Sequence, residues 1–162
     1  MRQLVLLVST ATFVLSSAVG LAIAENRSDF GERVAGTYLS NGGDDAVILQ
    51  LGRDGNVTVI LSEQFLSLGV IGESFSDTLG TWKRAGNRKI VASSVNIAFD
   101  GEIFVGVAAT KYVISFDPPF GTAFLGCTGA LFPPGVDTFA PNAEPIPGSE
   151  FTCNEYTLER LR

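Results

Sequence analysis

Short runs of alternating apolar and polar residues fill most of the chain, and turn-forming residues separate these runs. No long segment after residue 25 has the period of an amphipathic helix, whereas the period of two that is typical of strands recurs. Glycine-containing turn signals at 53–56, 85–88 and 100–101 mark hairpin connections. The pattern predicts eight strands, at residues 33–40, 46–52, 56–62, 78–84, 89–100, 102–117, 120–132 and 151–162.

The predicted strands indicate an all-β protein. Eight antiparallel strands in a chain of this length are typical of a small up-and-down β-barrel with room for at most one ligand, and a β-sandwich is the competing architecture. Residues 63–77 are rich in glycine and serine, and we expect a lid-like loop or a short helix there. Residues 133–150 carry five of the seven prolines, so we expect an irregular segment.

The parity of each predicted strand suggests which residues face the barrel interior. In run 89–100 one face carries valine, isoleucine and phenylalanine, and the other carries alanine, serine and asparagine. We expect the more apolar face to point inward, as we do for the aromatic face of run 102–117. The expected ligand-lining residues are Tyr38, Trp82, Val95, Ile97, Phe99, Tyr112, Ile114 and Phe116.

The first 24 residues have the character of a targeting segment. Arg2 precedes an apolar run without acidic residues, and Ala22-Ile23-Ala24 has the small-x-small pattern of a signal-peptidase site. A retained membrane anchor is the alternative. We therefore predict a cleaved signal peptide over residues 1–24 and a single barrel domain over 25–162. The protein is then secreted or periplasmic, with no membrane insertion after cleavage.

The two cysteines fit this export prediction. Cys127 lies in the seventh predicted strand and Cys153 in the eighth. An even number of cysteines in an exported chain favours a disulfide, which would staple the proline-rich segment at its base. Two free thiols are the alternative.

The composition excludes several kinds of chemistry. The chain has no histidine, which removes Ser-His and Cys-His catalysis and the commonest transition-metal ligand. No phosphate-binding glycine loop is present, and the net charge of −6 disfavours nucleic-acid binding. We assign no catalytic residue, metal ligand or cofactor. Acid–base chemistry remains open through the following residues: Glu63, Glu73, Asp77, Asp117, Glu150, Glu155, Tyr38, Tyr112 and Tyr156.

The only tryptophan, Trp82, stands beside a cluster of cations, and this combination admits two interpretations. One is a binding site. The other is a hairpin whose charged shoulders are solvated, with Trp82 closing one end of the barrel beneath a stacked Arg84 or Arg160. We favour the second. The cations around this turn are Lys83, Arg84, Arg88 and Lys89.

Two short features resemble the calycin-type barrels, which include the lipocalins. The stretch AGTYL at residues 35–39 resembles the Gly-x-Trp motif of the lipocalin first strand, with Tyr38 in place of tryptophan. Arg160 resembles the basic residue that packs across that aromatic ring in lipocalins. The general pattern is also similar to that of the allene-oxide-cyclase and dirigent barrels. The resemblance implies an eight-stranded barrel, a fold that hosts carriers, cyclases and inert proteins alike.

Three functions agree with these observations. The first is a non-enzymatic protein that binds a small apolar molecule in the barrel. The second is a structural or interaction module of the cell envelope with a filled core. The third is a cofactor-free isomerase or cyclase that uses carboxylate and tyrosine groups. The sequence predicts no oligomeric state.

Overall fold

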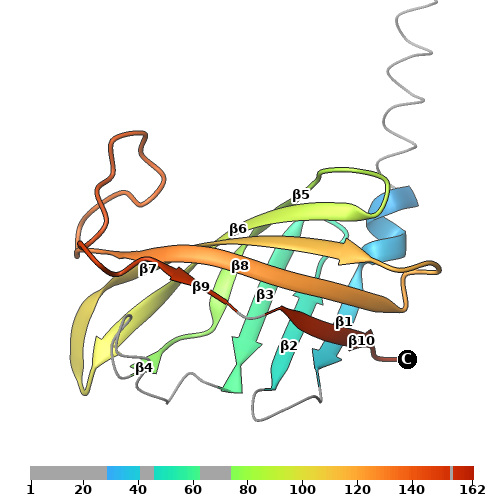
Figure 1. Ribbon diagram of the computed structural model, residues 1–162, viewed down its shortest axis with the longest axis horizontal. Coiled ribbons are helices and arrows are strands. Elements are labelled where there is room, and N and C mark those ends of the chain that lie inside the picture. Colours follow the sequence, from blue (N-terminus) through green and yellow to red (C-terminus); the bar gives the residue numbers. More distant parts are fainter. Residues whose placement is uncertain (1–28, 41–45, 63–73, 154) are drawn as a thin grey trace, which may run out of the picture.

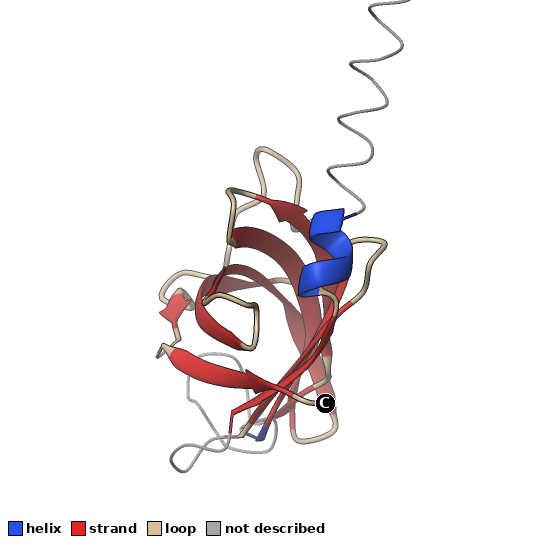
Figure 2. Ribbon diagram, turned by 90° about the vertical axis from the view of Figure 1, so that its right-hand side faces the viewer, coloured by secondary structure: helices blue, strands red, loops and turns tan. Residues whose placement is uncertain are grey.

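The computed structural model describes residues 29–40, 46–62, 74–153 and 155–162 as a closed antiparallel β-barrel of eight strands (Figure 1). Figure 2 shows the strands curving round into the barrel, with a short helix at one end. The predicted barrel is therefore confirmed, and the sandwich is not observed. The barrel strands are β1 (Gly36–Ser40), β2 (Val47–Leu51), β3 (Asn56–Leu61), β5 (Thr78–Arg84), β6 (Lys89–Asp100), β7 (Ile103–Phe116), β8 (Thr122–Phe132) and β10 (Tyr156–Arg160).

Each barrel strand pairs with the barrel strand that follows it in the sequence, which makes the fold an up-and-down meander. The barrel closes because β10 pairs with both β8 and β1, with Tyr38 opposite Arg160. Two short strands extend the sheet. Strand β4 (Ser74–Phe75) pairs with β6, and β9 (Phe151–Thr152) pairs with β8.

The structure corrects the two ends of the strand prediction. Residues 29–34 form a helix, so the first strand begins at Gly36 and not at residue 33. Phe30 and Val34 lie one helical turn apart and are both buried, while Asp29 and Arg33 form an ion pair at 3.6 Å on the exposed side. The predicted strand 151–162 is divided into β9 and β10.

Of the three long segments outside the predicted strands, the structure describes one in full. Residues 133–150 are irregular, as expected. Of the expected loop 63–77, residues 63–73 lie outside the described residues, and residues 74–75 form β4. The predicted signal peptide also lies outside them. Among the residues described, no helix has the length and apolar character needed to span a bilayer.

The barrel has two ends, which we name by what lies there. At the helix end, residues 29–34 lie against the barrel, and at the hairpin end the tip of the β6–β7 hairpin projects on the opposite side of the molecule (Figure 1). The larger apolar cluster occupies the helix end and the middle of the barrel. A smaller cluster occupies the hairpin end, and its buried members are Phe75, Ala98, Ala108 and Leu131.

Candidate functional site

A layer of polar side chains crosses the barrel interior between the two apolar clusters. Its residues come from three adjacent strands, because Gly80 on β5 pairs with Ser94 on β6, and Ser94 pairs with Thr110 on β7. Cross-strand partners point to the same face of a sheet, so these side chains meet inside. All are almost fully buried. We call this set the polar layer, and its members are Thr78, Ser94, Asn96, Thr110 and Tyr112.

Hydrogen bonds join the members of the polar layer. The side chains of Thr78, Thr110 and Ser94 all hydrogen-bond with the Tyr112 hydroxyl. The Ser94 hydroxyl also donates to the carbonyl oxygen of Thr110 at 3.3 Å. The layer therefore holds four hydroxyl groups, each able both to donate and to accept.

Asn96 is the exception within this network. Its Nδ2 donates to Thr78 Oγ1 across 3.5 Å, a long bond, and its Oδ1 has no hydrogen-bond partner among the described residues. The side chain is only 6% exposed. Leaving a buried amide oxygen without a donor costs about 1–3 kcal/mol, so such an atom needs an explanation. A group outside the described protein atoms is needed to satisfy it.

Burial raises the pKa of Tyr112 from 10.0 to about 12, and hydrogen bonds with Thr78, Thr110 and Ser94 offset part of this rise. Tyr112 is therefore a neutral phenol at physiological pH. Burial also raises the pKa of Tyr38, and the nearby Arg160 lowers it in part. The tyrosines inside the barrel thus supply hydrogen bonds and no charge.

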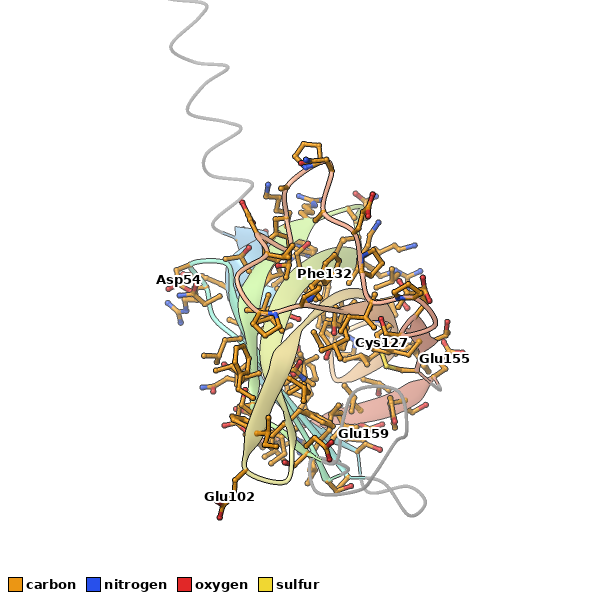
Figure 3. The ribbon with its side chains drawn as sticks, turned by 90° about the vertical axis from the view of Figure 1, so that its left-hand side faces the viewer. Asp54, Glu102, Cys127, Phe132, Glu155 and Glu159 are labelled. Carbon is orange, nitrogen blue, oxygen red and sulfur yellow. A yellow bond between two sulfur atoms is a disulfide. The ribbon has the colours of Figure 1, made fainter. Side chains whose placement is uncertain are left out.

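The described part of the interior carries no charged group. Its buried polar residues are serines, threonines and Asn96, and every aspartate and glutamate of the described ranges is exposed. Figure 3 shows several of them, with Glu102 at the hairpin end pointing away from the barrel and Asp54 on the outer surface. The cyclase hypothesis requires a buried carboxylate beside a tyrosine hydroxyl. Among these residues, Tyr112 has no such carboxylate beside it. Glu63 and Glu73 lie outside the described residues.

The helix end is closed by aromatic residues and arginines. Trp82 is buried there, donates from Nε1 to the carbonyl oxygen of Gly52 at 3.0 Å, and packs edge-on against Phe30 of the helix with ring centroids 6.3 Å apart. The guanidinium of Arg84 stacks on Phe30, 4.6 Å from its ring centroid, and not on Trp82 as we expected. Trp82 therefore helps to close the barrel, in agreement with the interpretation favoured above.

Arg160 lies across Tyr38 at the same end. Its guanidinium is 5.9 Å from the Tyr38 ring centroid and donates to the carbonyl oxygens of Arg33 and Ala35. Gly36 makes room for it, because a Cβ at that position would come within 2.8 Å of Arg160 Nε. Tyr38 completes the arrangement by donating to the Val34 carbonyl at 2.9 Å. These contacts tie the helix to β1 and β10.

The structure divides the eight expected ligand-lining residues into two groups. Five are buried and face inward, namely Tyr38, Trp82, Tyr112, Ile114 and Phe116. The inward placement of the other three was wrong, because the inner face of β6 carries Ile90, Ala92, Ser94, Asn96 and Ala98. The outward-facing residues are Val95, Ile97 and Phe99.

The register explains this correction. Ala92 pairs with both Trp82 and Tyr112, and the two large rings leave room for only a small side chain between them. Counting apolar residues favoured the opposite face of β6. The polar layer was consequently missed, although the run of alternating small residues beside two bulky aromatics was a usable signal.

The predicted disulfide is present between Cys127 and Cys153, whose Cα atoms are 5.1 Å apart. Cys153 also donates from its backbone N–H to the Cys127 carbonyl at 3.0 Å, so the bridge fastens the chain where the proline-rich segment returns to β8. A disulfide agrees with an oxidising compartment. Within the described ranges, no three histidine, cysteine or acidic side chains gather as a metal site would require.

Neither a protein-family model, nor a curated protein, nor a solved structure matches the chain. The resemblance to calycin-type barrels therefore stays a prediction. The contact of Arg160 with Tyr38 is the geometry that this resemblance implies.

Proposed function

We propose that this protein is exported and binds a small, neutral amphipathic molecule inside its barrel. The observation that carries the proposal is the buried Oδ1 of Asn96, which lacks a donor among the described residues. Binding sites for small molecules are mostly apolar, with a few placed polar groups that orient the ligand. An apolar barrel crossed by one polar layer has this composition.

The polar group of the ligand is best supplied by a hydroxyl. A hydroxyl donates to Asn96 Oδ1 and accepts from a neighbouring threonine, serine or tyrosine hydroxyl of the polar layer. If the oxygen and nitrogen of the Asn96 amide were exchanged, the free atom would be a donor, and a ligand hydroxyl would satisfy it equally well. The hydroxyl therefore fits either orientation of the amide.

The apolar body of the ligand is supported by the surroundings of the layer. Ala92, Ala98 and Ala108 line β6 and β7 beside it and contribute only a methyl group each. Leu49 and Val59, on β2 and β3, provide larger buried apolar side chains. Such neighbours favour an aliphatic or aromatic body and do not require a specific shape.

A charged ligand is disfavoured at this position. No lysine or arginine of the described residues is buried in the interior, so a carboxylate would lose its hydration without gaining a counter-charge. The proposal therefore predicts a preference for alcohols over the corresponding acids.

A fluorescence titration tests this proposal. Trp82 is the only tryptophan of the chain and lies two residues from Gly80, on the same face and next to the polar layer, so its emission reports on the interior. We expect decanol to change this emission saturably, and decanoate to have little effect on it. Asn96→Leu is expected to weaken decanol binding at least about tenfold, which corresponds to about 1.4 kcal/mol.

Asn142→Leu is the matched control, because it makes the same replacement at an exposed position of the proline-rich segment. Thermal unfolding establishes that both variants are folded. The proposal is wrong if decanol leaves the emission of Trp82 unchanged, or if the folded Asn96→Leu variant binds decanol as tightly as the parent does. Either result would mean that a group other than the ligand, such as a buried water, satisfies Asn96.

A further inference from the structure

A second feature lies on the outside of the barrel and is independent of the proposed interior site. The outer faces of β5, β6 and β7 expose apolar side chains to solvent, among them Leu79 at 58% and Ile97 at 45%. Phe139, on the proline-rich segment, is 61% exposed and lies beside the same face. Contiguous exposed apolar surface of this kind usually marks a binding site.

This surface contains a groove of about 440 Å³. Leu79, Val91 and Val95 provide its apolar floor, and the ring of Phe139 contributes to its lining from another part of the chain. Lys83 is the only charged residue that lines it among those described. We call this the outer groove. Its volume lies in the range of sites that hold one small molecule.

Two lysines place positive charges in and beside the outer groove. Lys83 lines it directly, and Lys111 lies on the adjacent strand, opposite the groove residue Ser93. Both side chains are exposed, and neither forms an ion pair with a described residue. Each lysine is therefore available to a negative group that lies on the apolar floor.

The segment that carries Phe139 is held in place from several sides. The disulfide between Cys127 and Cys153 closes its base, and the Ser149 hydroxyl donates to the Leu131 carbonyl while accepting from the Leu131 N–H. Asp137 accepts from the N–H of Phe139 at 3.1 Å and so fixes the local turn. A ligand that binds against a preorganised segment loses less conformational entropy.

We propose that the outer groove binds a free amphipathic anion, meaning a molecule with an apolar chain or ring and one carboxylate. The apolar part lies on Leu79, Val91 and Val95 beneath Phe139, and the carboxylate pairs with Lys83. Lys111 adds to the attraction from the neighbouring strand. The ligand class differs from that of the interior site by its charge, so the two sites are separable by experiment.

Amide chemical shifts measured during a decanoate titration test this proposal. We expect saturable shifts at Thr81, Ser93 and Phe139, which line or flank the outer groove, and none at the side-chain amide of Asn96. Decyltrimethylammonium has a similar chain and the opposite charge, and we expect it to bind at least about tenfold more weakly. Raising the salt concentration should weaken decanoate binding because it screens Lys83.

Variants separate the contributions of charge and ring. Lys83→Gln is expected to weaken decanoate binding several-fold, because Lys83 lines the outer groove. Lys89 is exposed on the same face but does not line the groove, so Lys89→Gln should weaken binding less. Phe139→Ala should weaken binding by a factor similar to that of Lys83→Gln. None of these changes should alter the response of Trp82 to decanol.

Three results would overturn the proposal. The first is a decanoate titration that shifts the Asn96 side-chain amide and not the groove residues. The second is equal binding of decanoate and decyltrimethylammonium. The third is binding to anionic lipid vesicles without any binding of free decanoate, which would make the surface a membrane contact.

Discussion

The two faces of strand β6 show how this barrel distributes its chemistry. Apart from Ile90, the inner face is made of small and polar residues, with Ser94 and Asn96 at its centre. The outer face is more apolar, with Val95 and Ile97 directly beside them in the chain. In an ordinary half-buried strand the polar residues face solvent. This exchange of roles agrees with the two proposed binding sites, since neither composition is the most favourable for stability alone.

The largest change in stability is expected when adjacent residues on opposite faces of the neighbouring strand β7 are truncated. Ile114 is fully buried in the larger apolar cluster, and its neighbour Val113 is 38% exposed. Ile114→Ala is expected to lower the free energy of unfolding by about 2–5 kcal/mol, because it leaves a cavity. Val113→Ala is expected to change it by no more than about 0.5 kcal/mol.

Chemical denaturation of both variants measures these values. Equal losses at the two positions would contradict the assignment of inner and outer faces in β7.

Reduction of the disulfide should act on both stability and the outer groove. Cys127 and Cys153 are 26 residues apart, and the chain-entropy model gives a disulfide across such a loop about 3.5 kcal/mol of stabilisation. We also expect weaker decanoate binding, because the segment carrying Phe139 loses its anchor. Decanol binding in the interior should persist while the barrel remains folded. Parallel titrations of the oxidised and reduced protein test this, and unchanged decanoate binding would contradict the anchoring role.

Alkaline pH should destabilise the protein through Tyr112. Its pKa is raised in the folded state from 10.0 to about 12, so its contribution to stability is present in full below pH 10.0 and is lost as the pH rises towards 12. A shift of this size corresponds to about 2–3 kcal/mol. Tyr112→Phe should move the midpoint of alkaline unfolding to higher pH. Unfolding curves at increasing pH measure it, and an unchanged midpoint would argue against the burial of this hydroxyl.

The smallest predicted change in the free energy of unfolding is an increase. Asn96→Leu removes a buried amide with an unpartnered oxygen and keeps a similar volume, so we expect the ligand-free protein to become more stable by about 1 kcal/mol. A residue that lowers stability where it stands is typical of a functional site. Thermal unfolding in the absence of ligand provides the measurement. A loss of more than about 2 kcal/mol would show that Asn96 is a structural residue.

The sequence was sufficient to predict the eight barrel strands, apart from the bounds of the first and the last. Turn signals and period-two runs gave β5 and β6 with their observed bounds, because aspartate, glycine and asparagine act locally on the backbone. The start of the first strand was predicted wrongly, because residues 29–34 form a helix. This helix depends on Phe30 packing against Trp82 and Phe120, which are distant in sequence. Such long-range contacts leave no local pattern.

The inner and outer faces of β6 were harder to predict for the same reason. The face that a strand turns inward depends on its register with neighbours, and a shift by one residue exchanges all side chains. Trp82 and Tyr112 were placed inside correctly, and pairing them with Ala92 would have placed Ser94 and Asn96 inside as well. The outer groove could not be predicted from strand register alone. It joins β5 and β6 to Phe139, which lies in a segment without a predictable conformation.

The most direct test of the interior site is a high-resolution crystal structure of the protein grown with decanol. The account predicts a ligand hydroxyl within hydrogen-bond distance of Asn96 Oδ1, with an apolar chain continuing from it between the inner faces of the barrel. The result that would contradict it is an isolated water molecule at Asn96 in crystals saturated with decanol, with closely packed side chains around it.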